Sequence, residues 1–368
     1  MDVRFQNNSL SVSYQNKNFQ LHPIWLRERL PGEEFFDVDT HQRLYEPSSI
    51  DLDLQISSAT LSDHLLNIEF NDGVKGSYNM NDLLLEMDDE KNKRGPLPKR
   101  VLWNSSLSQF PEAQFEEGMA EKKSMYDLLI NFYKYGFVII KNVPTENKYL
   151  LKFVNSIGPV KNTNFGEYFD VMSKPNPNDL AYKPIALPPH TDNPYRKPTA
   201  PGIQFLHCLQ NEVSGGFSTL VDGFAVAEHI KTRDPEAFQS LTTTNLRYQF
   251  QDKDIVLENW GELIELDDDG DYKQVRYSTR VDYVPPLDTE KLNTFYRSRK
   301  LLSELYSASD FELKFKLQPG DIMMFDNHRL LHGRTAYDSN EGMRHLQGCY
   351  LEFDATDGKL RHLARKFQ

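Results

Sequence analysis

Turns divide the second half of the chain into short apolar segments, and this pattern limits the possible fold more than any other feature. The segments that have the length and composition of strands are 202–208, 217–222, 274–278, 312–317, 321–326 and 345–353. Two helical stretches, 224–241 and 287–306, interrupt them. Many short strands with few helices predict a mainly β fold, a sandwich or jelly roll with flanking helices.

The first third of the chain has a different organisation. Residues 1–95 alternate and turn often, which predicts a small β-rich N-terminal domain. The polar, proline-containing stretch 96–118 is interpreted as a linker to a main domain over 119–368. That domain should begin with a helix over 123–134, with Ser124 as its N-cap, and a strand from Gly136 to Pro144.

Charge and cysteine content exclude several classes of partner. The net charge is −12 and no block of Lys and Arg occurs, so neither nucleic acid nor an anionic membrane is an expected partner. No signal peptide and no membrane-spanning apolar run is visible. The only cysteines, Cys208 and Cys349, lie in apolar runs and are interpreted as buried thiols in a reducing compartment. We therefore expect a cytoplasmic protein.

A candidate metal site begins with the pair His190 and Asp192. On a strand, residues two apart point to the same face, so an imidazole and a carboxylate there can bind one ion. One such pair is a common chance match and needs a third ligand. His332 supplies a candidate, because it follows an apolar strand and can approach the pair when a sheet folds on itself.

Two histidines and one carboxylate form the facial triad of non-haem Fe(II) oxygenases, which leaves coordination positions open. The spacing of His328 and His332 would suggest zinc on a helix, but the preceding strand and Gly333 argue against a helix. Arg344 opens the last predicted strand, where a buried guanidinium could bind a dicarboxylate through two hydrogen bonds. An ordinary surface arginine at a strand start is the alternative.

These features lie within motifs that resemble a known family over nearly the whole chain. The matching stretches are Trp25–Arg27, His190–Tyr195, Pro201–Cys208, Gly215–Gly216, Val221–Phe224, Asp326–Arg334 and Arg344–Tyr350. The sequence resembles the γ-butyrobetaine hydroxylase group of Fe(II)/2-oxoglutarate dioxygenases, with trimethyllysine dioxygenase and the trimethylaminoethylphosphonate dioxygenases.

The resemblance implies a double-stranded β-helix in which His190, Asp192 and His332 bind Fe(II). Arg344 would bind the distal carboxylate of 2-oxoglutarate, with Ser218 as a possible helper, and O₂ would be the second cosubstrate. It also implies a homodimer. The zinc-binding cysteines of the animal enzymes' N-terminal domain have no counterpart, since no cysteine precedes Cys208.

The family binds a trimethylammonium group in an aromatic cage, where ring faces attract a cation that cannot donate hydrogen bonds. The residues at the cage positions are Phe165, Phe169, Tyr182 and Tyr350. Core packing is the alternative for any one of these rings.

The opposite end of the substrate should meet a second group of residues: Asn193, Arg276, Tyr277, Asp179 and Tyr195. γ-Butyrobetaine enzymes have asparagines where this chain has Asp179 and the segment 276–278, and an apolar residue in place of Asn193. The gain of Arg276 and Asn193 suggests a more highly charged anion, and a phosphonate offers three acceptor oxygens.

The leading hypothesis is therefore hydroxylation of 2-(trimethylammonio)ethylphosphonate at the carbon next to phosphorus. γ-Butyrobetaine, which would give carnitine, is the close alternative, and trimethyllysine is third. A betaine-binding module without turnover and a zinc hydrolase remain possible on the residues alone.

Overall fold

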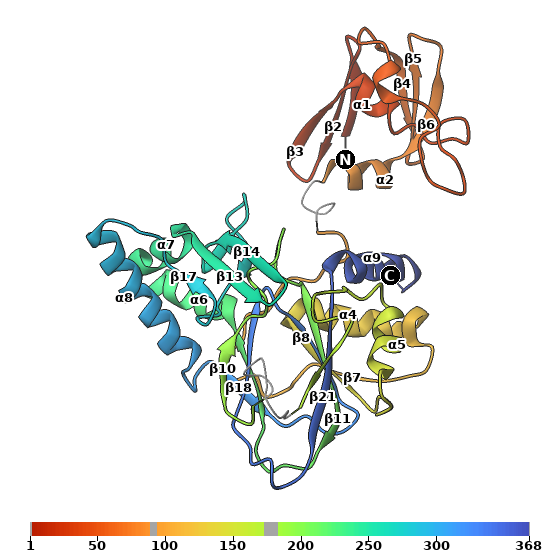
Figure 1. The fold of residues 1–368 in the computed structure, drawn as a ribbon. Coiled ribbons are helices and arrows are strands. Elements are labelled where there is room, and N and C mark those ends of the chain that lie inside the picture. The colour runs from red at the N-terminus through yellow and green to blue at the C-terminus, as the bar shows by residue number, and fades with distance from the viewer. Residues whose placement is uncertain (1, 89–93, 173–182, 368) are drawn as a thin grey trace. The chain divides into compact units, whose positions relative to one another are not determined.

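The computed structural model describes residues 2–88, 94–172 and 183–367 (Figure 1). Internal contacts divide the chain into two units, Met1–Gly95 and Pro96–Gln368. Each unit has its own hydrophobic core. No helix in the described part of the chain is both long and apolar enough to cross a membrane.

The first unit consists of two three-stranded antiparallel sheets with short helices. Its elements are β1 (Asp2–Gln6), β2 (Ser9–Tyr14), β3 (Lys17–Leu21), α1 (Pro23–Arg27), β4 (Ile56–Ser62), β5 (Leu65–Phe70), β6 (Lys75–Asn79) and α2 (Met80–Met87). Alternation along β2 places Leu10 and Val12 in the core, fully buried, with the half-buried Ser11 between them. The β-rich character expected of this region is present.

Two sheets form the centre of the second unit. The major sheet has the order β7-β8-β19-β11-β21-β9, and the minor sheet has the order β10-β20-β12-β18. Their bounds are β7 (Glu112–Gln114), β8 (Phe137–Lys141), β9 (Phe169–Val171), β10 (Leu187–His190), β11 (Ile203–Asn211), β12 (Ser218–Asp222), β18 (Glu312–Phe315), β19 (Ile322–Asp326), β20 (Leu330–Arg334) and β21 (Arg344–Leu351). Apart from the parallel pair β7–β8, all neighbours are antiparallel. The mainly β prediction is confirmed.

Helices α4 (Lys123–Tyr135), α5 (Tyr149–Asn155) and α9 (Phe353–Phe367) pack against one face of the major sheet. The chain between β12 and β18, which are paired neighbours in the minor sheet, forms a second layer. It contains α6 (Gly223–Arg233), α7 (Pro235–Thr243), α8 (Thr289–Tyr306), the hairpin β13 (Leu246–Asp252) and β14 (Ile255–Gly261), β15 (Ile264–Leu266), β16 (Tyr272–Val275) and β17 (Asp282–Tyr283). The predicted helix 287–306 corresponds to α8.

Three local predictions differ from the structure. The single helix expected over 224–241 is broken after α6, because Pro235 cannot continue it and Asp234 caps α7 by accepting from the backbone of Ala237. Lys122 occupies the N-cap of α4 in place of Ser124. The stretch interpreted as a linker packs within the second unit, where Trp103 is 5% exposed and β7 pairs with β8.

Candidate active site

Three potential metal ligands come together on the minor sheet. His190 of β10 and His332 of β20 are directly opposite each other in the strand pairing, and their ring centroids are 4.3 Å apart. Asp192 follows β10, and its Oδ1 lies 3.4 Å from His190 Nε2 and 3.8 Å from His332 Nε2. The ligand atoms of the three residues lie within 4.8 Å of one another, which is the spacing of a shared ion.

The electrostatics of this group suit a divalent cation. Burial lowers the pKa of His332 to about 3, so its ring is neutral and has a lone pair for a metal. Burial alone would raise the pKa of Asp192, but the neighbouring His332 and His190 and a hydrogen bond from Tyr350 outweigh burial and hold it below its usual range. The neutral His332 ring and the Asp192 carboxylate, together with the imidazole of His190, therefore fit Fe(II).

The turn between β19 and β20 fixes the backbone of Asp192. The side-chain oxygen of Asn327 accepts from the Asp192 N–H at 2.7 Å, and its amide donates to the Asp192 carbonyl at 3.0 Å. The same amide donates to the Pro201 carbonyl at 2.9 Å, and Asn327 is fully buried. Because His332 follows in β20, one turn positions ligands that are far apart in the sequence.

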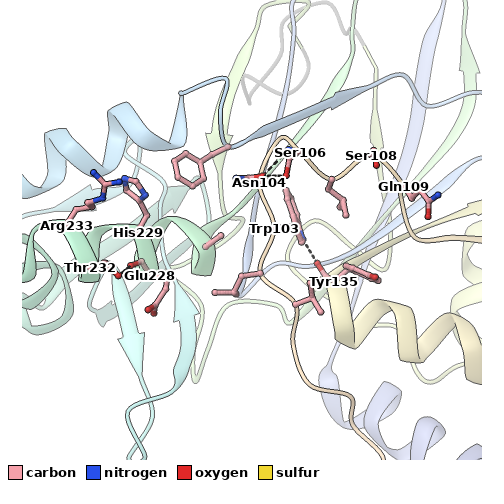
Figure 2. Close-up of a pocket in the computed structure, with 15 residues that line it drawn as sticks. Trp103, Asn104, Ser106, Ser108, Gln109, Tyr135, Glu228, His229, Thr232 and Arg233 are labelled. Carbon is pink, nitrogen blue, oxygen red and sulfur yellow. Dashed lines mark hydrogen bonds between the residues drawn. The ribbon is translucent and has the colours of Figure 1, made fainter.

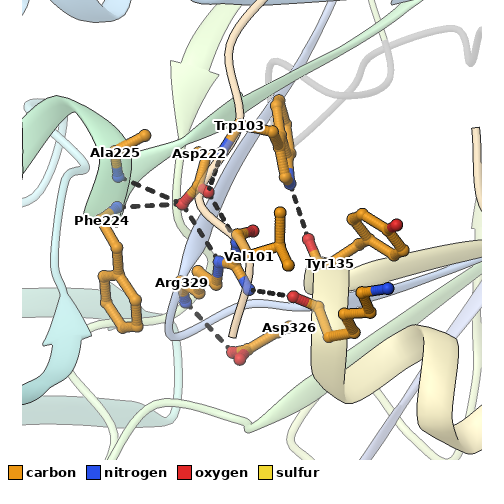
Figure 3. A network of polar contacts seen from close by, with 9 residues as sticks. Val101, Trp103, Tyr135, Asp222, Phe224, Ala225, Asp326 and Arg329 are labelled. Carbon is orange, nitrogen blue, oxygen red and sulfur yellow. Dashed lines mark hydrogen bonds and ion pairs between the residues drawn. The ribbon is translucent and has the colours of Figure 1, made fainter. Parts of the chain in front are cut away.

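A buried ion pair anchors the other side of this turn (Figure 3). Arg329 Nε and Nη2 bond the two carboxylate oxygens of Asp222 at 3.1 and 2.6 Å, and both residues are almost completely buried. Arg329 also donates to the carbonyls of Lys134 and Val101, while Asp222 accepts from the backbone of Trp103. The network joins the turn to α4, to the start of α6 and to the chain before β7.

Arg344 has the properties expected of an anion-binding arginine. It is 5% exposed, and burial together with the neighbouring Arg334 lowers its pKa to about 10. Its Nε donates to the Gly216 carbonyl at 3.3 Å, but its buried Nη1 has no partner among the described residues. Ser218, at the start of β12, is buried and lies opposite Arg334. An unpaired buried donor of this kind fits the carboxylate of 2-oxoglutarate.

The predicted aromatic residues lie in two groups. The rings of Phe169 and Tyr350 are 5.3 Å apart, and the Tyr350 hydroxyl donates to Asp192 Oδ2 at 2.7 Å. Phe165 instead contacts Phe250, a residue that the sequence analysis missed, and Phe250 stacks on Tyr195 at 5.0 Å. Tyr182 lies outside the described residues.

Some of the residues predicted to bind the anionic group of the substrate are already paired within the protein. Arg276 is 4% exposed and forms a close ion pair with Glu265, so its charge is already matched. Asn193 accepts from the Tyr195 hydroxyl, and its amide also interacts with the Tyr350 hydroxyl. Asp179 lies outside the described residues.

A small cavity of about 200 Å³ borders His190. One of its lining residues, Arg280, is a cationic side chain that was not predicted for the site. Tyr277, Thr279 and Arg280 line the cavity together with the C-terminal turns of α8. The Thr191 N–H donates to the Tyr277 carbonyl, and the Tyr277 N–H donates to the Thr191 hydroxyl. These two hydrogen bonds fix this segment beside the candidate metal ligands. The sequence signal for Arg280 was its position two residues after the segment 276–278 considered for the anion.

A different hollow, of about 810 Å³, lies between residues 101–109 and α6 (Figure 2). His229 and Arg233 of α6 face it, and His229 packs against Phe311. It contains none of the predicted site residues and, within the described ranges, no cluster of potential metal ligands. The chemistry therefore belongs to the site on the minor sheet.

Comparison with known proteins identifies the family. The model of the taurine catabolism dioxygenase TauD, TfdA family matches residues 104–350. The chain belongs to the TauD/TfdA family. γ-Butyrobetaine dioxygenase of Pseudomonas sp. (strain AK-1) is 30% identical over 94% of this chain and 90% of the relative. Trimethyllysine dioxygenase of Bos taurus is 29% identical over 93% of this chain and 82% of the relative.

A solved structure supports the same fold for this TauD/TfdA protein. The crystal structure of AAD-2 in complex with Mn(II) and N-oxalylglycine has a TM-score of 0.52 and 14% identity, and covers 69% of this chain and 97% of that one. The protein is an Fe(II)- and 2-oxoglutarate-dependent dioxygenase, with O₂ as the other cosubstrate. Membership of this family removes the zinc hydrolase and the non-catalytic binding module as alternatives.

Proposed function

We propose that the protein hydroxylates a trimethylammonium carboxylate, with γ-butyrobetaine as the first choice of substrate. The observation that carries the proposal is the contact between Tyr350 and Asp192, because it brings an aromatic wall for a cation next to a metal ligand. The similarity to γ-butyrobetaine dioxygenase supports the same choice. In this proposal the two sheets are those of a double-stranded β-helix.

His190, Asp192 and His332 would hold the iron, and Arg344 would bind the far carboxylate of 2-oxoglutarate through its unpaired Nη1. The bound metal supplies activation of O₂ for hydroxylation. The protein's own part is to orient the substrate and to exclude water, which the burial of His190 and His332, each 9% exposed, favours.

The cationic end of the substrate would lie against Phe169 and Tyr350. A quaternary ammonium has no N–H to donate, so ring faces attract it without leaving an unpaired donor. Phe165, Phe250 and Tyr195 would extend the aromatic wall, since their rings contact one another beside Asn193.

The argument for a phosphonate is weakened by the position of Arg276. Its guanidinium is matched by Glu265 and bonded to the Glu262 carbonyl, so it adds no free charge for a second anionic oxygen. A carboxylate needs fewer donors, and Arg280, which lines the cavity beside His190, is the candidate for binding it. We therefore place γ-butyrobetaine ahead of 2-(trimethylammonio)ethylphosphonate.

The test is turnover by protein reconstituted anaerobically with Fe(II) and then supplied with 2-oxoglutarate and O₂. γ-Butyrobetaine, trimethyllysine and the phosphonate are added separately, and succinate is measured together with a product heavier by one oxygen atom. We expect the fastest coupled turnover with γ-butyrobetaine. γ-Aminobutyrate, which lacks the methyl groups, is the matched control, and equal turnover of the two would refute recognition of the quaternary ammonium.

A further inference from the structure

The two carboxylate oxygens of Asp192 face different partners. Oδ1 is directed toward the metal-binding nitrogens, 3.4 Å from His190 Nε2 and 3.8 Å from His332 Nε2. Oδ2 accepts the hydroxyl of Tyr350 at 2.7 Å. One oxygen therefore faces the metal site, while a protein donor occupies the other.

Both groups in this hydrogen bond are held firmly. Tyr350 is 4% exposed, lies within β21 opposite Gln204 of β11, and packs its ring against Phe169. The backbone of Asp192 is bonded on both sides to Asn327. Rotation of the carboxylate would break a charge-assisted hydrogen bond, which is stronger than one between neutral groups.

We propose that the Tyr350 hydroxyl holds Asp192 as a one-oxygen ligand of the metal. A carboxylate can also bind a metal through both oxygens, and the second oxygen would then take a position that 2-oxoglutarate or O₂ requires. By occupying Oδ2, Tyr350 keeps that position open. Tyr350 is in this respect a positioning residue that acts through Asp192, apart from any contact between its ring and the substrate.

Tyr350→Phe tests the proposal because it removes the hydroxyl and keeps the ring. Affinities are measured without O₂, first for Mn(II) and then for 2-oxoglutarate on the Mn(II)-loaded protein. The freed oxygen should strengthen or maintain Mn(II) binding, while it competes with 2-oxoglutarate and weakens its binding about tenfold. These opposite directions separate positioning from general damage, which would weaken both.

Tyr133→Phe is the matched control, because the Tyr133 hydroxyl bonds Thr356 in the core beside α4 and α9, and its loss should change neither affinity. If Tyr350→Phe leaves 2-oxoglutarate binding within twofold of wild type, or weakens both ligands in parallel, the proposal is wrong. The inference rests on the proposed role of Asp192 as a ligand, which Asp192→Ala checks separately through loss of Mn(II) binding.

Discussion

The side-chain amide of Asn327 forms hydrogen bonds with both the N–H and the carbonyl of Asp192, as the backbone of a neighbouring strand would. Asp192 follows the end of β10, so no ladder hydrogen bonds of that strand hold it. The carboxylate of Asp192 consequently depends on a side chain from the β19–β20 turn for its position.

Asn327→Ala should therefore weaken metal binding. Partners that orient metal ligands typically contribute about 10- to 100-fold in affinity, and we expect a loss of about tenfold in a Mn(II) titration. Asn211→Ala is the control, because the Asn211 amide also donates to a backbone carbonyl, that of Leu317, at the other end of β11. Equal Mn(II) affinities of the two variants would contradict the role given to Asn327.

Arg329→Met should destabilise the protein by about 3–5 kcal/mol, since it leaves the buried Asp222 carboxylate without its cation. The free energy of unfolding in urea measures the effect. Arg297→Met removes an exposed pair with Glu236 and should change stability by less than about 1 kcal/mol. Similar effects of the two substitutions would show that the buried network does not carry the stability assigned to it.

His207 should make the protein sensitive to acid. It is fully buried with neither ring nitrogen bonded among the described residues, and burial lowers its pKa from 6.5 to about 4. Between these values the unfolded chain binds a proton that the folded protein excludes. The free energy of unfolding should thus fall by up to about 3 kcal/mol as the pH decreases from 6.5 to 4. His207→Phe should flatten this part of the pH profile, and an unchanged slope would count against the assignment.

Gly348→Ala should disturb the aromatic wall. A Cβ at this position of β21 would lie 2.4 Å from the ring of Phe169, which must then move away from Tyr350. We expect the KM for the trimethylammonium substrate to rise about tenfold, since cation–π contacts in a desolvated site contribute about 2 kcal/mol. Gly358→Ala on α9 has open space around its Cβ and should leave KM unchanged.

The candidate metal ligands could be selected from the sequence because each lies in a short recognisable pattern. A strand spacing joins His190 to Asp192, and the strand before His332 ends in a polar cluster. The supporting groups could not be found in this way. Asn327 and Arg329 lie in a recognised motif, but their partners are a backbone segment and a carboxylate more than a hundred residues away.

Arg276 illustrates a different limit. Whether a cation at the end of a short strand faces a ligand or a neighbouring carboxylate depends on the strand pairing, and here Arg276, which follows β16, pairs with Glu265 of β15. Helix α9 was missed, although Leu360, Leu363 and Phe367 have helical spacing, because a high density of charged residues obscures the pattern. The apolar side of α9 is nevertheless part of the core beside α4.

The direct opposition of His190 and His332 in paired strands has a consequence for how the protein matures. A slip of one residue between β10 and β20 would turn one imidazole to the far face, so the two histidines would bind one ion together only when the pairing is correct. During synthesis, His190 is translated well before β20, the strand that carries His332. Iron held by these two histidines would therefore be loaded only after β20 has been translated and has paired with β10.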